Sequence, residues 1–470
     1  MALSRRDLIV GTAVGAGLVV IGERSNLFSS SPSSPSSTST TVPRAPGTSQ
    51  TSLDPEPVGL GPLVPDPDGI LDLPEGFRYS IVSRAGDPLT GGGVMPGRPD
   101  GMAAFGGEGD QVRVVQNHEI GNSHPQPTLA SPELTYDPKA QGGTTTHVLD
   151  ARLAAVSTVV SLAGTWTNCA GGVTPWGTWL TCEETEQQAG PDADLDHGFV
   201  FEVDPVTSSN NPIPTPLTAL GRFAHEAVCV DPDSGTLYLT EDAGGPNGLV
   251  YRFEPTDRTP AYGALRNGGT LTAMRCSSEG QPAPDLSVFT VVGTTLQVTW
   301  TAIPDPQAAT VSVRNQLGDN EVTRSRKFEG AWWGDHPDGG RAHIVCSFAR
   351  VEDGSLAAHD GQVWAYDPQR KTLTLEVRFA PNPNPDSDNP DGPDNITVSP
   401  HGGLMLAEDG QGLQHLFAID DQGAAQAFAR NRVSSSELTG VCFSPDGQTL
   451  FVSIQDDGLT FAVQGPFARR

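Results

Sequence analysis

A short strand pattern that ends in two adjacent acids recurs along the chain and constrains the fold more than any other feature. The clearest copies are GTWLTCEE at 177–184, GTLYLTED at 235–242 and GGLMLAED at 402–409. Their apolar and polar residues alternate, as in a half-buried strand. The gap between the first two copies is close to one third of the next gap, which indicates a unit of roughly 56 residues. Repeats of strand-only units at this length are typical of β-propeller blades.

Further strand patterns support an all-β fold. Related strands without the double acid lie at 112–119, 293–300, 342–348 and 449–457. A second kind of strand, often closing on Asp-Pro, follows several of them at 197–205, 248–255, 361–368 and 412–420. With 54 Gly and 41 Pro the chain is rich in turns, and few windows show apolar residues at helical spacing. We therefore predict an all-β propeller, with paired β-sandwiches or a β-helix as alternatives and no blade count from the residues alone.

The first sixty residues carry targeting and linker signals. An SRR motif at 4–6, followed by a Gly/Ala-rich apolar stretch, resembles a twin-arginine export signal, and the stretch is too short to span a bilayer. A retained anchor is the alternative to cleavage. Ser, Thr and Pro then dominate, as in a flexible linker. We expect a signal at 1–24, a linker at 25–60 and a propeller catalytic domain at 61–470, exported by the twin-arginine machinery to the periplasm, the cell surface or the medium.

Charge and cysteine content exclude several classes of protein. The net charge is −28, from 56 acids and 28 bases, and such a surface repels nucleic acid and anionic membranes. We expect a monomer with no nucleic-acid partner. Six cysteines without a CxxC pair are too few for a disulfide framework. Cys182, Cys229, Cys346 and Cys442 lie in apolar strand patterns, whereas Cys169 lies in a glycine-rich turn pattern.

The acidic strand ends predict a metal site. In a propeller, one end of the strands near the axis converges, so the acids of several blades would meet and repel one another. Calcium, which prefers oxygen ligands, would remove this repulsion, while the thiolate of Cys169 suits iron better. The alternative is that each acid caps a turn on a solvated loop. Further candidates lie on predicted loops: Glu226 in RFAHEAVCV, Glu329 in KFEGAWW and Asp394 in DGPDNITVSP.

Six motifs together resemble the PhoX-type alkaline phosphatases over most of residues 70–465. They are TNCAGGVTPWGTWLTCEE, GRFAHEAVCVDPDSGTLYLTED, FEGAWW, GQVWAYDP, PDNITVSPHGGLMLAEDG and GVCFSPDGQTLFVSIQ. The resemblance implies a six-bladed propeller with iron (Fe³⁺) and calcium (Ca²⁺) clustered at the channel mouth. It implies that Cys169 is the iron thiolate and that Glu226 and Glu329 are iron-side carboxylates. It implies mostly calcium ligation for Glu184, Glu241, Asp242, Asp394, Glu408 and Asp409.

The same resemblance implies hydrolysis of small phosphate monoesters by a metal-bound oxygen nucleophile. The family has a basic residue two positions before the glutamate of the FEG motif, which is Lys327 here, with Arg326 beside it. These residues and Asn168 are expected to hold the phosphoryl oxygens, Lys327 as a point charge. No Ser-His-Asp arrangement or nucleophile elbow is apparent in the sequence. A calcium-dependent lactonase-type propeller and a non-catalytic exported scaffold remain the alternatives.

Overall fold

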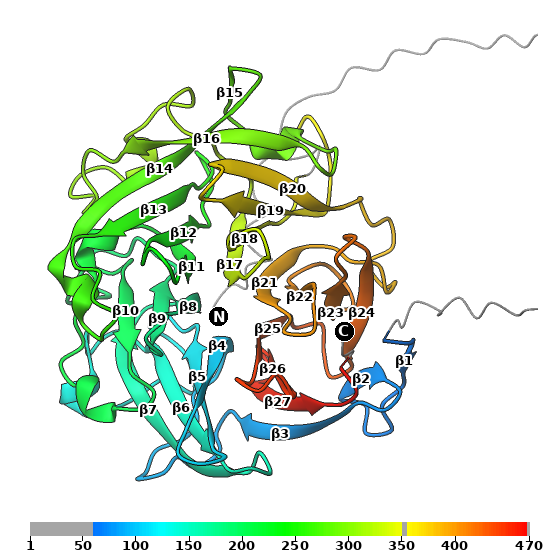
Figure 1. Ribbon diagram of the computed structural model, residues 1–470. Helices are drawn as coiled ribbons and strands as arrows, with labels where there is room; N and C mark the ends of the chain where they lie inside the picture. Colours follow the sequence, from blue (N-terminus) through cyan, green and yellow to red (C-terminus); the bar gives the residue numbers. More distant parts are fainter. Residues whose placement is uncertain (1–59, 350–354, 468–470) are drawn as a thin grey trace, which may run out of the picture. The chain divides into compact units, whose positions relative to one another are not determined.

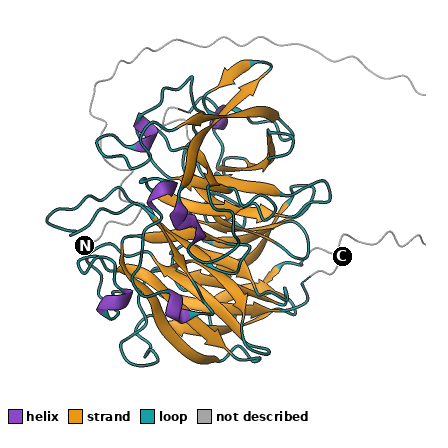
Figure 2. Cartoon of the chain, turned by 60° about the vertical axis from the view of Figure 1, so that its left-hand side comes forward, coloured by secondary structure: helices purple, strands orange, loops and turns teal. Residues whose placement is uncertain are grey.

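A computed structural model describes residues 60–349 and 355–467 of the 470-residue chain, and its regular structure is almost entirely β. These residues contain 27 strands and only short 3-10 helices, which lie in the connections (Figure 2). The all-β prediction is confirmed. No helix in these two ranges has the length and apolar character to cross a membrane. The short helices are η2 (Pro132–Leu134), η3 (Ser208–Asn210), η4 (Thr218–Leu220), η5 (Ala264–Asn267), η6 (Leu286–Val288) and η7 (Val313–Asn315).

Six strands line the centre of a ring, and each begins one blade. Each inner strand packs against the next, and the last packs against the first, so the ring is closed (Figure 1). The described residues thus form a propeller with six inner strands. The inner strands of blades 1 to 6 are β4 (Pro99–Gly106), β8 (Asn168–Val173), β11 (His225–Val230), β17 (Phe328–Gly334), β21 (Pro393–Val398) and β25 (Leu438–Phe443).

Antiparallel neighbours continue each blade outward. Blade 1 adds β5 (Val112–His118), β6 (Gly142–Leu149) and β7 (Ala155–Thr165), and blade 2 adds β9 (Trp179–Glu183) and β10 (Val200–Val203). Blade 3 adds β12 (Leu237–Glu241), β13 (Val250–Pro255) and β14 (Gly269–Ser278), and blade 4 adds β18 (Arg341–Cys346), β19 (Gly361–Asp367) and β20 (Thr372–Phe379). Blade 5 adds β22 (Leu404–Glu408), β23 (His415–Ile419) and β24 (Ala425–Asn431), and blade 6 adds β26 (Thr449–Ile454) and β27 (Leu459–Gln464).

The first described strands join the last two blades. Strand β2 (Leu71–Pro74), itself paired with β1 (Leu63–Val64), pairs with β24, and β3 (Arg78–Arg84) pairs with β27. Early strands therefore complete the outer edges of blades 5 and 6. This non-local pairing closes the ring and covers strand edges that would otherwise be exposed.

The structure refines where the repeated strands lie. The three strands that lead into the acid pairs are β9, β12 and β22. Each is the second strand of its blade, so an inner strand lies between it and the axis. The pattern at 293–300 was expected to be an equivalent strand, and this was wrong. Its strand, β16 (Thr295–Ala302), pairs with both β14 and β20 and thereby joins blades 3 and 4 in one sheet, to which β15 (Gln281–Ala283) is added at β14.

All six inner strands have a β-bulge at the same position. In β8, for example, Asn168 pairs with Glu183 and Gly171 pairs with Thr181, so two residues face a single residue of β9. The same shift occurs in β4, β11, β17, β21 and β25. A bulge re-aims the side chains that it contains. The repeat therefore presents one re-aimed residue from each blade at the same level of the channel.

Side chains fill the channel below this level. Trp332 of β17 packs against the core clusters of blades 4 to 6 and of blades 1 and 2, which places its indole at the axis. Only about 20 Å³ of space remains beside it, little more than one water molecule occupies. Gly330 allows this packing, because a Cβ there would lie 2.7 Å from the carbonyl oxygen of Asp394. Side chains therefore fill the channel below the bulges.

Candidate metal centre

The bulges carry most of the potential metal ligands. The first bulged residue is a carboxylate or a thiol in five of the six blades, and the second is mostly small. Sequence patterns put Glu226, Glu329 and Asp394 on loops and Cys169 in a turn, which was wrong, because all four lie on inner strands. The first bulged residues of blades 1 to 6 are Asp100, Cys169, Glu226, Glu329, Asp394 and Gly440.

A second set of acids comes from the residue that follows a second strand. Glu184, Asp242 and Asp409 each come directly after β9, β12 and β22, and all three are partly buried. Successive side chains of a strand point to opposite faces. The second acid of each pair therefore points away from its predecessor, and the two acids of a pair have different surroundings.

Six of these side chains, together with Glu437, form three groups, each with ligand atoms within 4.8 Å of one another. Glu226 belongs to the first two groups, and Asp394 belongs to the last two. The groups therefore adjoin across the mouth from blade 2 to blade 6. They are Cys169, Glu184 and Glu226; Glu226, Glu329 and Asp394; and Asp394, Asp409 and Glu437.

Glu437 is a member that sequence reasoning missed. It lies directly before β25 and is buried, with 8% of its surface exposed. The only signal was an acid just ahead of the inner strand of the last blade, in SSSELTG. Its partners Asp394 and Asp409 are close in space because the ring brings blades 5 and 6 side by side.

The first acid of the blade 2 pair is an anchor. Glu183 is fully buried and accepts hydrogen bonds from the backbone N–H of Trp166 (2.9 Å), Gly198 (2.8 Å) and Phe199 (3.0 Å). Its Oε1 also lies 2.6 Å from Nδ1 of His197. Since Glu184 follows directly, this cluster fixes the strand end that presents Glu184 to the mouth.

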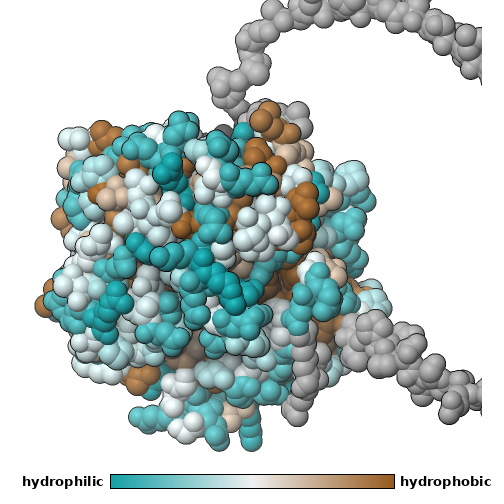
Figure 3. Space-filling view, turned by 45° about the horizontal axis from the view of Figure 1, so that its top comes forward, coloured by the Kyte–Doolittle hydropathy of each residue, from teal (hydrophilic) through white to brown (hydrophobic). Residues whose placement is uncertain are grey.

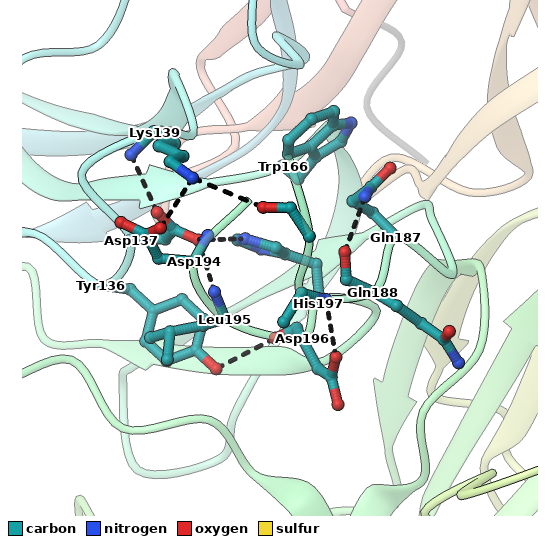
Figure 4. Close-up of polar contacts among 12 residues, drawn as sticks. Tyr136, Asp137, Lys139, Trp166, Gln187, Gln188, Asp194, Leu195, Asp196 and His197 are labelled. Atoms are coloured by element: carbon teal, nitrogen blue, oxygen red, sulfur yellow. Dashed lines mark hydrogen bonds and ion pairs between the residues drawn. The ribbon is translucent and has the colours of Figure 1, made fainter. Parts of the chain in front are cut away.

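His197 lies between two buried carboxylates. Its Nε2 lies 3.3 Å from Asp137, which also accepts the backbone N–H groups of Asp194 and Leu195 (Figure 4). Burial lowers the pKa of His197, but its hydrogen bonds to Glu183 and Asp137 and the negative charges of these two acids together outweigh burial and raise that pKa. The imidazolium form donates from both nitrogens, so a buried positive charge compensates the two acids.

The first acids of blades 3 and 5 are bound in the same way. Glu241 accepts the hydroxyl of Tyr251 at 2.6 Å and lies 3.2 Å from Arg314, while burial raises its pKa to about 7. Glu408 accepts the backbone N–H and Nδ1 of His415, at 2.8 and 3.0 Å. Both were predicted as metal ligands. The structure places both outside the three groups, with their oxygens engaged by residues of their own blades and, for Glu241, Arg314.

Two basic residues reach the mouth from opposite blades. Lys327 precedes β17, with its Nζ 2.7 Å from Glu329 and 3.9 Å from Asp242. Arg98 holds the equivalent place before β4 and pairs with Glu119 at 2.7 Å. Both have a positive φ of 44°, a left-handed conformation that costs a residue with a Cβ about 1 kcal/mol. Thr167 before β8 and Gly392 before β21 also have a positive φ, so this backbone conformation belongs to the repeated entry into the inner strand.

Asn168 and Arg326 were predicted to hold phosphoryl oxygens. Asn168 is fully buried, and its amide donates to Thr181 and accepts from Thr165. The oxygen and the nitrogen of the amide are both engaged in these hydrogen bonds, which hold β8 in place. Arg326 is partly buried, and its Nε has no hydrogen-bond partner among the described residues. Lys327, the third predicted phosphate-binding residue, contacts Glu329, which is a member of the metal-ligand groups.

The donor set fits bound cations. In the middle group, Glu226 and Glu329 are fully buried, and Asp394 is nearly so. The positive charge beside this group is that of Lys327, which pairs with Glu329. Adjacent buried carboxylates destabilise a fold unless cations neutralise them. A thiol among the carboxylates of the first group suits iron, and the oxygen-only third group suits calcium. None of the six cysteines, all of which lie in the described ranges, forms a disulfide.

The chain is similar to several known proteins. The chain resembles the solved structure of Pseudomonas fluorescens PhoX in complex with vanadate, described as a transition state analogue, at 20% identity and a TM-score of 0.64, covering 84% of this chain and 96% of that one. It also matches a gluconolactonase from Xanthomonas campestris at 13% identity and a TM-score of 0.42, covering 86% and 98%. No protein of curated function matches.

The model of the alkaline phosphatase PhoX family matches residues 58–160 and 149–458, which is most of the chain. The match includes every residue of the three metal-ligand groups. The chain belongs to the PhoX alkaline phosphatase family.

Proposed function

We propose that this protein is a metal-dependent phosphatase that hydrolyses small phosphate monoesters at the propeller mouth. The observation that carries the proposal is the chain of three adjoining ligand groups, which share Glu226 and Asp394. Shared carboxylates suit a cluster of several ions rather than one isolated ion. Family membership gives the cluster its reaction class.

The proposed ions are iron and calcium. Cys169, Glu226 and Glu329 would hold iron, because a thiolate is a soft ligand. Asp394, Asp409 and Glu437 would hold calcium with oxygen atoms only. Glu184 and Asp242 would provide further carboxylates at the mouth. Glu241 and Glu408 would hold the ends of their strands in position through their hydrogen bonds. Bound cations would neutralise the phosphoryl oxygens and lower the pKa of a coordinated water.

The protein's own residues bind and orient the substrate. Lys327 offers an ammonium next to Glu329, where it can bind a phosphoryl oxygen as a point charge. Its left-handed backbone fixes the direction from which it approaches. Arg326 can add a second charge, and Asn168 keeps β8, and with it Cys169, in register. Trp332 fills the channel beneath, so substrate would enter from the mouth.

The test is hydrolysis of p-nitrophenyl phosphate by the purified protein. Activity should disappear in EDTA and return when calcium and iron are added together. Calcium alone should restore little, because the proposed iron site includes Cys169. If the metal-loaded protein hydrolyses no phosphate monoester, the proposal is wrong.

We also propose export by the twin-arginine route and a monomeric protein with a single propeller domain at 61–470. Residues 1–59 lie outside the described residues, so support for export comes from the SRR motif and the linker composition alone. The face in Figure 3 is mostly hydrophilic, with apolar residues in small separate groups, which agrees with a monomer. Analytical ultracentrifugation and fractionation of the producing cell test these two points.

A further inference from the structure

A second cavity lies at the other end of the strands from the metal-ligand groups. It has a volume of about 590 Å³ and is lined by residues of blades 3 and 4. Trp333, in its wall, lies four positions after Glu329 in β17, a distance of about 13 Å along the strand. Tyr238, also in the wall, precedes Glu241 in β12 by three positions. The cavity is therefore separate from the candidate metal centre.

Four aromatic rings form one side of the cavity. The Tyr238 ring lies 5.2 Å from Tyr366, 6.1 Å from Trp300 and 6.3 Å from Trp333, which is nearly parallel to it. The two tyrosines are buried, whereas the two tryptophans are partly exposed. The Trp300 indole N–H donates to the Tyr366 hydroxyl at 3.3 Å, and the guanidinium of Arg252 lies 5.0 Å from the Trp300 ring. These contacts hold Trp300 as a rigid, partly exposed apolar face.

Hydrogen-bonding groups accompany the rings. Arg252 and Ser234 contribute polar side chains to the lining of the cavity. Further polar side chains of the lining are those of Asp233, Thr236, Thr299, Gln369 and Lys371. The cavity therefore offers both donors and acceptors next to apolar faces.

The charge balance favours a neutral ligand. Arg252 is paired with Glu254 at 2.8 Å, so little of its charge is left for an anion. Asp231 and Asp233 lie in the same lining as Lys371, and the whole chain carries a net charge of −28. Such surroundings repel phosphate and other anions. A ligand that uses these groups must form hydrogen bonds without carrying charge.

We propose that this cavity binds a neutral saccharide unit. A pyranose ring presents a face of C–H groups that stacks on an indole, and hydroxyls around its edge that both donate and accept. The volume lies in the range of about 300–1,000 Å³ that is usual for small-molecule sites. Because the site is remote from the metal-ligand groups, the inference does not depend on the proposed phosphatase activity. Binding here would hold the enzyme on a polysaccharide while the mouth stays open to substrate.

Native gels that contain a dissolved polysaccharide test the proposal with the full-length protein. The probes are hydroxyethyl cellulose, dextran, laminarin and galactomannan, with polygalacturonate as an anionic comparison. We expect at least one neutral polymer to retard the protein. Trp300→Ala, which removes the exposed ring, should weaken that retardation at least tenfold, and Trp300→Phe should keep most of it. Trp176→Ala removes another partly buried indole, which donates to Glu202 outside the cavity, and should leave retardation unchanged.

Three results would overturn the inference. One is that no neutral polymer retards the protein. Another is that polygalacturonate alone retards it, which would indicate charge rather than stacking. The third is that Trp300→Ala, with an unchanged circular dichroism spectrum, is retarded as strongly as the parent. Hydrolysis of p-nitrophenyl phosphate should stay within twofold in both Trp300 variants, so a failure of the phosphatase proposal would be seen separately.

Discussion

Blades 2 and 5 bring the same set of parts to the mouth but differ at the bulge. Each has a bulged inner strand, an acid after its second strand, and an anchored acid bound to a histidine of the chain that follows. The bulged residue is Cys169 in blade 2 and Asp394 in blade 5. The repeated backbone therefore decides where a ligand lies, and the side chain at the bulge decides which ion it suits.

A second difference concerns the two histidines. His197 lies between Glu183 and Asp137, and all three side chains are fully buried. His415 lies between buried Glu408 and Asp388, whose side chain is 52% exposed. Water can replace an exposed partner but not a buried one. We therefore expect the two anchors to differ in strength although they have the same form.

The largest expected effect is that of Cys169→Ala. Loss of the thiolate should remove the proposed iron ligand and lower kcat for p-nitrophenyl phosphate by about a hundredfold or more, because the charge on the phosphoryl group is no longer neutralised. Steady-state kinetics in calcium and iron provide the measurement.

Cys182→Ala is the matched control. Cys182 is equally buried, on β9, but belongs to none of the three ligand groups. It should lose stability by about 1–2 kcal/mol through a small cavity while keeping its activity. Equal loss of activity in both variants would contradict the proposed role of Cys169 as a metal ligand.

The next effect is that of Asp409→Asn in blade 5. Asp409 belongs to one ligand group only, so an amide there should weaken calcium binding by about tenfold without removing iron. Added calcium should restore the activity of this variant, which can be followed by titration of the apoprotein. Failure of rescue, or loss of iron, would mean that blades 2 and 5 do not hold different ions.

The two histidines should differ in stability. His197→Gln leaves two buried carboxylates without their cation and should lower the free energy of unfolding by about 3 kcal/mol. His415→Gln should cost about 1 kcal/mol, since Asp388 is solvated. Urea unfolding of the apoproteins measures both. Equal costs would show that burial of the second partner does not matter.

The smallest effect is a change in pH dependence. The pKa of His197 is raised, against burial, by its hydrogen bonds to Glu183 and Asp137 and by their charges, so its contribution is complete below the ordinary histidine pKa of about 6.5. That contribution is lost as the pH rises through the higher folded-state pKa. The apoprotein should therefore lose stability on the alkaline side of about pH 6.5, and His197→Gln should flatten that slope. An unchanged slope in the variant would exclude a charged His197.

Sequence alone predicted the strands and the acid repeat because both follow from local alternation. The opposite directions of Glu241 and Asp242, or of Glu408 and Asp409, also follow from that alternation, yet all four were expected to bind metal. The structure instead shows Glu241 and Glu408 bound by residues of their own blades and, for Glu241, by Arg314 of the following insertion.

Other features depend on closure of the ring and could not be read from the chain. The bulges turn the predicted loop positions of Glu226 and Glu329 into inner-strand positions. Arg98 pairs with Asp456, which is far away in sequence, because blades 1 and 6 are neighbours. The glycine-rich pattern after Cys169 is required by packing between strands, because a Cβ at Gly171 or Gly172 would collide with neighbouring strands of blades 2 and 3.

The central claim is that one repeated backbone geometry holds two kinds of ion. Metal analysis by mass spectrometry of the parent protein and of Cys169→Ala, both purified without chelator, tests it most directly. We predict iron and calcium in the parent, and calcium without iron in the variant. Calcium without iron in the parent, or iron retained in full by the variant, would contradict the account.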